Sequence, residues 1–273
     1  LRPYGGLLVG PTDPGAPATR PPGEAVPPPL GLGLGFAFRR GAVPGAGNWT
    51  HGYADAGNTA CSSDALAFGA FDLLWFGRPG PQFMYERHVK AAAPLCDGGL
   101  LFVNGMEYLA GVDAYNGTVL WERHEPGSGR MAMLKDCGNV ATADGRLYAA
   151  VGNRCLVIEG LSGRTVADHP VPGLPLEKAR WDYIAVAGDL LLGSATRPEA
   201  RMVPTDKADY NAVWYHNQPV ITSLSLFALD RASGRTAWTY APRRGAVVNP
   251  TLTVLDGRLC FVESTNAETL AHA

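Results

Sequence analysis

The side chains best suited to binding or chemistry stand in four short groups, each just ahead of a run of apolar residues. They are arginine, histidine, asparagine, aspartate and tryptophan residues, namely Arg87, His88, Asn139, Arg180, Trp181, Asp182 and Asn249. An aromatic face beside such polar groups suits a planar or anionic small molecule. The same residue types also hydrogen-bond turns between strands, and the sequence leaves that alternative open.

No catalytic residue and no metal ligand can be assigned from a motif. The five cysteines include no Cys-x-x-Cys pair, so a zinc ribbon or a redox dithiol is unsupported. A Gly-x-Ser-x-Gly turn for a nucleophilic serine is also missing from the sequence. The carboxylates considered for a ligand site are those of Glu107, Asp136, Asp182 and Glu263, and none belongs to a recognisable ligand cluster.

The amino-acid composition narrows the class of protein to which these residues belong. A formal charge of −2 argues against nucleic-acid binding, which needs a basic surface. The 34 glycines and 22 prolines favour short strands and tight turns over helices. No apolar run is long enough to span a membrane, and no secretory signal pattern is visible.

The strands are indicated by a repeat. Three windows of eleven residues, at 111–121, 157–167 and 228–238, align without gaps and share an acidic third residue and a glycine at the seventh position. Each window predicts a strand, a turn and a second strand. A further strand pair precedes each window, and a fourth copy of that pair lies at 256–262. The equivalent residues Gly99 and Gly145 are 46 positions apart, a period that predicts four-stranded blades of a β-propeller.

The windows resemble the tryptophan-docking motif of quinoprotein-like β-propellers, which are related to pyrroloquinoline quinone (PQQ) dehydrogenases. That motif reads Ala-x-Asp-x-x-Thr-Gly-x-x-x-Trp, and residues 228–238 match it with serine in place of threonine. Residues 48–59 are similar to the segment that leads into such propellers. The docking-motif positions here are Asp113, Gly117, Trp121, Glu159, Gly163, Asp230, Gly234 and Trp238, with Ala167 where a third tryptophan is expected.

The resemblance implies an all-β, quinoprotein-like β-propeller, present as a partial ring of about four four-stranded blades. Each docking tryptophan would stack on backbone of the neighbouring blade. The polar groups named first would lie in loops at the propeller axis, where a protein or small-molecule ligand would bind. The resemblance also implies a periplasmic or cell-envelope location.

Three functions remain open at this point. The first is a binding or scaffold module without catalysis, since similar propellers include the outer-membrane assembly lipoprotein of bacteria. The second is part of a PQQ-dependent oxidoreductase with Ca²⁺ as its metal, a cofactor set implied by the resemblance alone. The adjacent cysteine pair common in those dehydrogenases is absent from this sequence. The third is the targeting module of a methyltransferase fusion.

Residues 1–47 differ from the rest of the chain in composition. They hold 10 prolines and 11 glycines and predict an extended linker. Residues 1–9 resemble the Leu-Arg-Pro-Gly-Gly stretch of class I S-adenosylmethionine-dependent methyltransferases, which implies the tail of a lost upstream domain. Residues 48–273 are predicted to form the partial propeller, with a loop insertion at 194–222.

Overall fold

A computed structural model describes residues 4–10, 22–27, 34–80, 82–83, 93–129, 137–175, 177–198 and 220–271. Within these ranges the chain is nearly all β. Helical structure there is confined to the 3₁₀ turn η1 (Asn249–Thr251) and the short helix α2 (Ala267–Ala271). Neither of these described helices has the length and apolar character needed to cross a bilayer.

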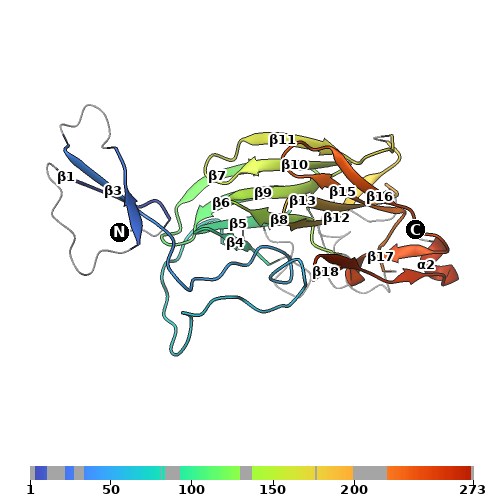
Figure 1. The fold of residues 1–273 in the computed structure, drawn as a ribbon, viewed down its shortest axis with the longest axis horizontal. Coiled ribbons are helices and arrows are strands. Elements are labelled where there is room, and N and C mark those ends of the chain that lie inside the picture. The colour runs from blue at the N-terminus through green and yellow to red at the C-terminus, as the bar shows by residue number, and fades with distance from the viewer. Residues whose placement is uncertain are drawn as a thin grey trace.

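Three antiparallel sheets of four strands form the body of the molecule (Figure 1). The first contains β4 (Leu95–Asp97), β5 (Leu100–Gly105), β6 (Tyr108–Asp113) and β7 (Val119–His124). The second contains β8 (Val140–Ala143), β9 (Arg146–Val151), β10 (Arg154–Glu159) and β11 (Thr165–Pro170). The third contains β12 (Arg180–Ala187), β13 (Leu190–Thr196), β15 (Ser225–Asp230) and β16 (Thr236–Tyr240).

A fourth group of strands, which we call the fourth sheet, consists of two separate sheets. A three-stranded part joins β14 (Thr222–Ser223), β17 (Ala246–Val248) and β20 (Glu263–Ser264), and a hairpin joins β18 (Thr253–Leu255) and β19 (Arg258–Cys260). The prediction of an all-β propeller-type fold with about four blades is therefore confirmed. We call β4, β8, β12 and β18 the inner strands, and β7, β11 and β16 the outer strands.

The turns that close the repeated windows explain the shared acid and glycine. In the first, the Gly117 amide donates to the Asp113 carbonyl at 2.9 Å, and the Asp113 carboxylate accepts from the Tyr115 amide at 2.9 Å. Gly117, Gly163 and Gly234 have φ of +74°, +70° and +70°, which a residue with a Cβ adopts only with strain. The turns therefore need glycine at this position and an acceptor four residues before it.

Apolar residues fill the spaces between neighbouring sheets. The first and second sheets enclose a cluster that includes Phe102, Leu109 and Trp121, and the second and third enclose one that includes Tyr148 and Trp181. A third cluster lies between the third and fourth sheets. Because each pair of neighbouring sheets encloses one of these clusters, apolar residues of the inner and middle strands are buried between sheets.

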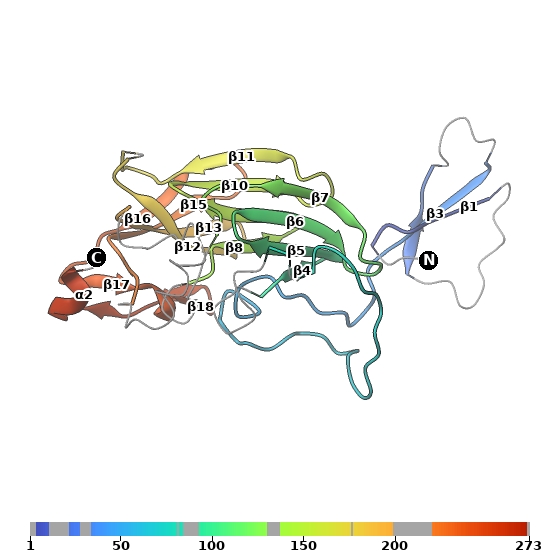
Figure 2. The same cartoon turned by 180° about the vertical axis from the view of Figure 1, so that it is seen from behind.

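The structure differs from the linker expectation in residues 1–47. Strands β1 (Leu7–Gly10), β2 (Gly23–Ala25) and β3 (Phe36–Arg40) form a three-stranded sheet in the order β1-β3-β2. Figures 1 and 2 show this sheet projecting from the rest of the molecule. The apolar stretches 7–9 and 36–38 bring two strands together within a Pro/Gly-rich region, and composition averaged over the whole region hides them. Its relation to a methyltransferase stays a hypothesis.

The loop insertion predicted at 194–222 overlaps a strand at each of its two ends. Ser194 and Thr196 belong to strand β13, and Thr222 begins β14. Residues 199–219, which make up most of the insertion, lie outside the described residues. The strand extension follows from pairing, because Ala195 lies opposite Ser225 of β15 in the same sheet.

Candidate functional site

Residues 49–58, which we call the axial strap, cross the inner strands of the sheets. Trp49 and Cys96 of β4 exchange two backbone hydrogen bonds of 2.8 Å. The Thr142 amide of β8 then donates to the Thr50 carbonyl at 2.9 Å. An inner strand has unpaired N–H and C=O groups along its free edge, and the strap supplies partners for them.

The strap continues onto the third and fourth sheets. The Val186 amide of β12 donates to Nε2 of His51 at 3.0 Å. Further along, the Val254 amide of β18 donates to the Ala56 carbonyl at 2.8 Å. One short segment therefore bonds to the inner strand of each of the four sheets, and it ties together strands that are far apart in the chain.

His51 holds the strap in one defined protonation state. Because Nε2 accepts from Val186, the ring proton is on Nδ1, which lies 2.8 Å from the Thr50 hydroxyl oxygen. That hydroxyl in turn donates to the Ala54 carbonyl at 3.3 Å. Burial lowers the pKa of His51 to about 4, although the Asp55 carboxylate acts in the opposite direction. His51 is therefore neutral at physiological pH and serves as a structural acceptor.

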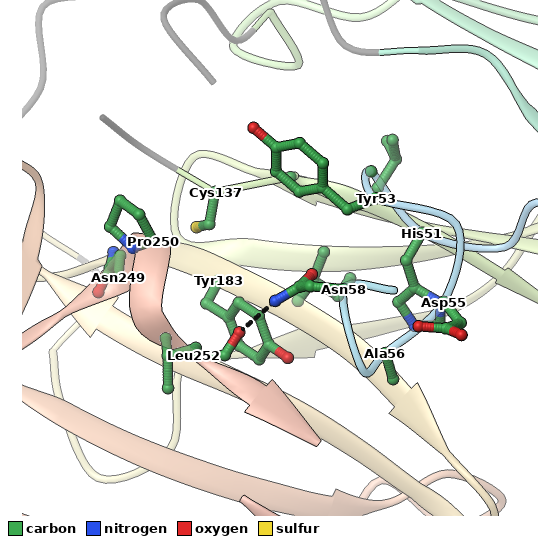
Figure 3. A pocket seen from close by; sticks show the side chains of 14 residues that line it. His51, Tyr53, Asp55, Ala56, Asn58, Cys137, Tyr183, Asn249, Pro250 and Leu252 are labelled. Atoms are coloured by element: carbon green, nitrogen blue, oxygen red, sulfur yellow. Dashed lines mark hydrogen bonds between the residues drawn. The ribbon is translucent and has the colours of Figure 1, made fainter. Parts of the chain in front are cut away.

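A small cavity remains between the strap and the sheets (Figure 3). Its volume is about 30 Å³, and residues around it include Tyr53, Asn58, Cys137, Tyr183 and Leu252. Asn58 bridges it by donating from Nδ2 to the Leu252 carbonyl at 2.8 Å. A buried water needs roughly 10–15 Å³ of such space, and ligand pockets run to hundreds of Å³. The described residues leave room for about two waters there.

A buried polar network links the third and fourth sheets beside this cavity. Asp182, Ser194, Ser223 and Asn249 are all fully buried. Asn249 Nδ2 donates to Asp182 Oδ2, and the Ser223 hydroxyl donates to Asn249 Oδ1 at 2.7 Å. Ser223 Oγ also lies 2.8 Å from Ser194 Oγ, which accepts from the Tyr183 amide. Two residues from the sequence-predicted set, Asp182 and Asn249, therefore meet, and they hydrogen-bond each other.

The other predicted site residues that the structure describes do not join them. Trp181 is 1 % exposed and packs edge-on against Phe227 with ring centroids 4.7 Å apart, so its indole is core, not an open aromatic face. Asn139 is buried and donates to the Ser128 carbonyl at 2.6 Å, as the turn-bonding alternative expects. Arg180 begins β12 and pairs with Thr196 across the sheet. Arg87 and His88 lie outside the described residues.

Aromatic rings contact the repeated turns at the outer strands. Trp121 donates from Nε1 to the Gly160 carbonyl of the second sheet at 2.7 Å, and a Cβ at Gly163 would lie 2.6 Å from its ring. The same contact is made one sheet earlier by Trp75, which donates to the Ala114 carbonyl at 2.9 Å and covers Gly117.

Trp75 was missed by the sequence reading because no strand pattern surrounds it. One signal was present in the sequence: Trp75 precedes Gly117 by 42 residues, and Trp121 precedes Gly163 by the same interval. In the third sheet the turn glycine Gly234 is covered by the ring of His169. Ala167, at the expected tryptophan position, has no ring to offer.

Comparison with known proteins gives a likeness of fold. No protein-family model matches the sequence, and no curated protein matches it. A europium-containing methanol dehydrogenase is similar with a TM-score of 0.43 and 10 % identity, over 73 % of this chain and 32 % of that protein. A quinohemoprotein alcohol dehydrogenase from Comamonas testosteroni gives 0.45 and 13 %, over 72 % and 28 %. BamB from Moraxella catarrhalis gives 0.29 and 13 %, over 57 % and 52 %.

The chain thus spans about a third of the two dehydrogenases and about half of BamB. At these identities and TM-scores, the likeness concerns architecture and carries no argument about activity. The chain is similar to propellers that include both dehydrogenases and BamB, and the choice between catalysis and binding has to come from its own residues.

The residues around the cavity under the strap do not fit the quinone and metal that the family resemblance implied. The cavity under the strap is far smaller than a ligand pocket. All five cysteines are free, so no disulfide stands against a planar cofactor. Across the described ranges, no three His, Cys, Asp or Glu side chains form a group that could hold a metal ion. No step involving PQQ or Ca²⁺ is derived for this chain.

Proposed function

We propose that the chain is a β-propeller binding module without catalysis, which contacts its partner through its outer surface and not through the axis. The observation that carries this is the axial strap. It hydrogen-bonds to the inner strands of all four sheets and leaves a cavity of about 30 Å³ beneath it. An axis filled by the protein's own backbone stiffens the arrangement of the sheets, which suits a scaffold.

A surface suited to binding lies on the segment that follows the strap. Residues 66–76, which we call the apolar loop, expose Phe68, Phe71 and Phe76 by 81 %, 79 % and 93 %. Leu73 and Leu74 in the same loop are 73 % and 71 % exposed. Single exposed apolar side chains are ordinary, whereas a run of this kind is typical of an interaction site.

The experiment that separates a binding module from a quinone enzyme is a titration with PQQ and Ca²⁺. Quinone absorbance and quenching of tryptophan fluorescence are measured as PQQ is added to micromolar concentrations in excess of the protein. Wild type and an Asn58→Ala variant are measured in parallel. Asn58 closes the cavity, so its truncation tests whether a cryptic site opens. We expect no saturable change with either protein. Saturable quinone binding by wild type, together with alcohol-dependent dye reduction, would overturn the proposal.

A further inference from the structure

The first three sheets share a contact between two of their turns, and in each sheet it joins equivalent residues. The turn between the third and fourth strands donates a backbone N–H to a carbonyl of the turn between the first and second strands. The donor and acceptor are Ala114 and Gly99 in the first sheet, Gly160 and Gly145 in the second, and Arg231 and Asp189 in the third, at 3.0, 2.9 and 2.9 Å. We call the surface beside each of these bonds the turn niche of its sheet.

The turn niche of the first sheet holds the ring of Tyr4, which comes from the segment before β1. A Cβ on Gly99 would lie 2.9 Å from the Tyr4 ring and 3.0 Å from the ring of Tyr115, the residue that follows the donor Ala114. The centroids of the two tyrosine rings are 6.3 Å apart. The Tyr4 amide donates to the Gly41 carbonyl at 3.0 Å, so the end of the three-stranded sheet presents this ring. Within the chain, a tyrosine from a distant segment therefore docks on this niche.

The turn niche of the second sheet makes the same backbone bond, but no ring from the described part of the chain covers its glycine. A Cβ on Gly145 would have no described neighbour within 4 Å. A cavity of about 360 Å³ lies there, and Leu100, Leu161 and Tyr4 are among the residues that line it. Leu161, which takes the place of Tyr115, is 65 % exposed. The volume is that of a ligand pocket, and an aromatic ring placed in it would bury apolar area against these side chains.

The turn niche of the third sheet differs in the side chains that surround it. Asp189 stands in the place of Gly145, and Ala232 stands in the place of Leu161. The Arg231 side chain pairs with Asp144 of the second sheet at 2.7 Å. The cavity at this niche, about 320 Å³, is lined mainly by charged residues, namely Asp144, Arg146, Asp189, Asp230 and Arg231. An aromatic ring would therefore desolvate charged groups in the third niche and contact apolar groups in the second.

Polar groups in the second niche favour one kind of ring. Besides its apolar side chains, the cavity is lined by Asp144, Arg146 and Glu159. Asp144 is held by its ion pair with Arg231, and Glu159 accepts a hydrogen bond from the Ser162 hydroxyl. A tyrosine hydroxyl has a proton to donate to such a carboxylate, whereas phenylalanine has no donor. The niche therefore suits tyrosine better than phenylalanine.

We propose that the second turn niche binds a tyrosine side chain from an exposed segment of a partner protein, as the first niche holds Tyr4. This rests on the proposed function, since it names a contact between the binding module and its partner. The new contact would be continuous with the existing one, because Tyr4 docks on the first niche and lines the second. It also adjoins the apolar loop, because the turn that carries Tyr115 accepts the Trp75 indole N–H at the Ala114 carbonyl.

The test is a titration with the peptide acetyl-Gly-Gly-Tyr-Gly-Gly-amide, followed by the backbone amide NMR shifts of the isotope-labelled chain. Peptides with phenylalanine or leucine in place of the tyrosine are the ligand controls. Leu161→Asp places a charge in the second niche, and Ala232→Asp is the matched substitution at the equivalent residue of the third. Both residues are exposed, so the circular dichroism of these variants should match the wild type. Tyr4→Ala removes the ring that covers the first niche.

We expect the tyrosine peptide to shift the amides of Gly145, Arg146 and Leu161 saturably, with a dissociation constant in the millimolar range. The phenylalanine peptide should bind at least about threefold more weakly, and the leucine peptide should not saturate. Leu161→Asp should raise the dissociation constant at least about tenfold, and Ala232→Asp should leave it unchanged. In Tyr4→Ala the tyrosine peptide should also shift the Gly99 amide, because the first niche is then open.

Three results would overturn the proposal. The first is a wild type without saturable shifts at the second niche, and the second is an equal loss of binding in Leu161→Asp and Ala232→Asp. The third is a Tyr4→Ala variant in which the peptide leaves Gly99 unshifted, because these turns would then not select a tyrosine ring. A phenylalanine peptide that bound as tightly would overturn the assignment to tyrosine. The quinone titration tests the proposed function independently, because PQQ and the peptide are added in separate experiments.

Discussion

The junction between the first and second sheets and the junction between the second and third use the same turn with different rings. At the first, Trp121 is 9 % exposed, covers Gly163 and donates to the Gly160 carbonyl. At the second, the smaller ring of His169 covers Gly234, and no indole among the described residues takes its place. The turn backbone is nearly identical at both places, with φ of +70° at each glycine.

The difference shows which feature of the junction is required. Residues two apart on a strand point to the same face. His169 therefore faces the turn from the same side as Ala167, and it supplies the ring that Ala167 lacks. Arg123 occupies the position of His169 in the first sheet and donates to the Gly163 carbonyl at 3.2 Å. Both positions thus face the next turn. The junction needs a flat group over an open glycine, and either of two strand positions can supply it.

The largest expected effect is the loss of Trp121. Trp121→Ala removes a buried ring and leaves the Gly160 carbonyl without its donor, so the free energy of unfolding should fall by about 3–5 kcal/mol. Urea denaturation of the two proteins measures it. Trp238→Ala is the matched control, because that ring is exposed, and it should cost about 1 kcal/mol or less. Equal losses of stability for the two variants would contradict the claim that the buried ring over Gly163 stabilises its junction more than the exposed Trp238 ring does.

The next largest effect is the pH dependence that His51 gives to the free energy of unfolding. This contribution has to be separated from that of His169. The unfolded imidazole titrates near 6.5 and the folded one near 4, so the unfolded state binds more protons between these values. Stability is complete above pH 6.5 and falls by about 3 kcal/mol as the pH drops to 4. His51→Gln keeps an acceptor for Val186 and should abolish most of this slope in denaturation measured at several pH values. A slope unchanged by the substitution would contradict the role given to His51.

A smaller effect distinguishes the two turn glycines. A Cβ at either position meets a ring at 2.6 Å and forces a residue into φ near +70°. The backbone strain alone costs about 1–3 kcal/mol at both. Gly163→Ala should cost more than Gly234→Ala, since the Trp121 ring is fixed by its hydrogen bond and the His169 ring can shift. Thermal unfolding of both variants tests the order, and a larger loss for Gly234→Ala would reverse the interpretation.

The sheets were predictable because their signals are local. The acid, the glycine and the alternating apolar residues lie within eleven positions, and the 46-residue period repeats them. The path of the strap was not predictable, because His51 bonds to Val186, 135 residues away, through a backbone amide that any residue carries. Trp181 was predicted to be a site residue because polar residues stand beside it in the sequence. Its position on β12 instead places the indole in the core.

The smallest expected effect is the pH dependence of stability that His169 contributes, and it tests the difference between the two junctions most directly. Burial lowers the pKa of His169, although Asp168 beside it, paired with Arg154 at 2.5 Å, acts in the opposite direction. The folded state therefore favours the neutral ring, and the second junction weakens as the pH falls below 6.5, whereas the ring over the first turn is the indole of Trp121, which does not titrate. In a His51→Gln background, the loss of stability that remains between pH 6.5 and the range in which carboxylates titrate should disappear with His169→Phe, which keeps a flat ring over Gly234. Trp121→Phe in the same background should lower stability equally at all pH values. If His169→Phe left the acid slope unchanged, the histidine would not be the titrating group of this junction, and the two junctions would differ in ring size and in the indole hydrogen bond but not in pH dependence.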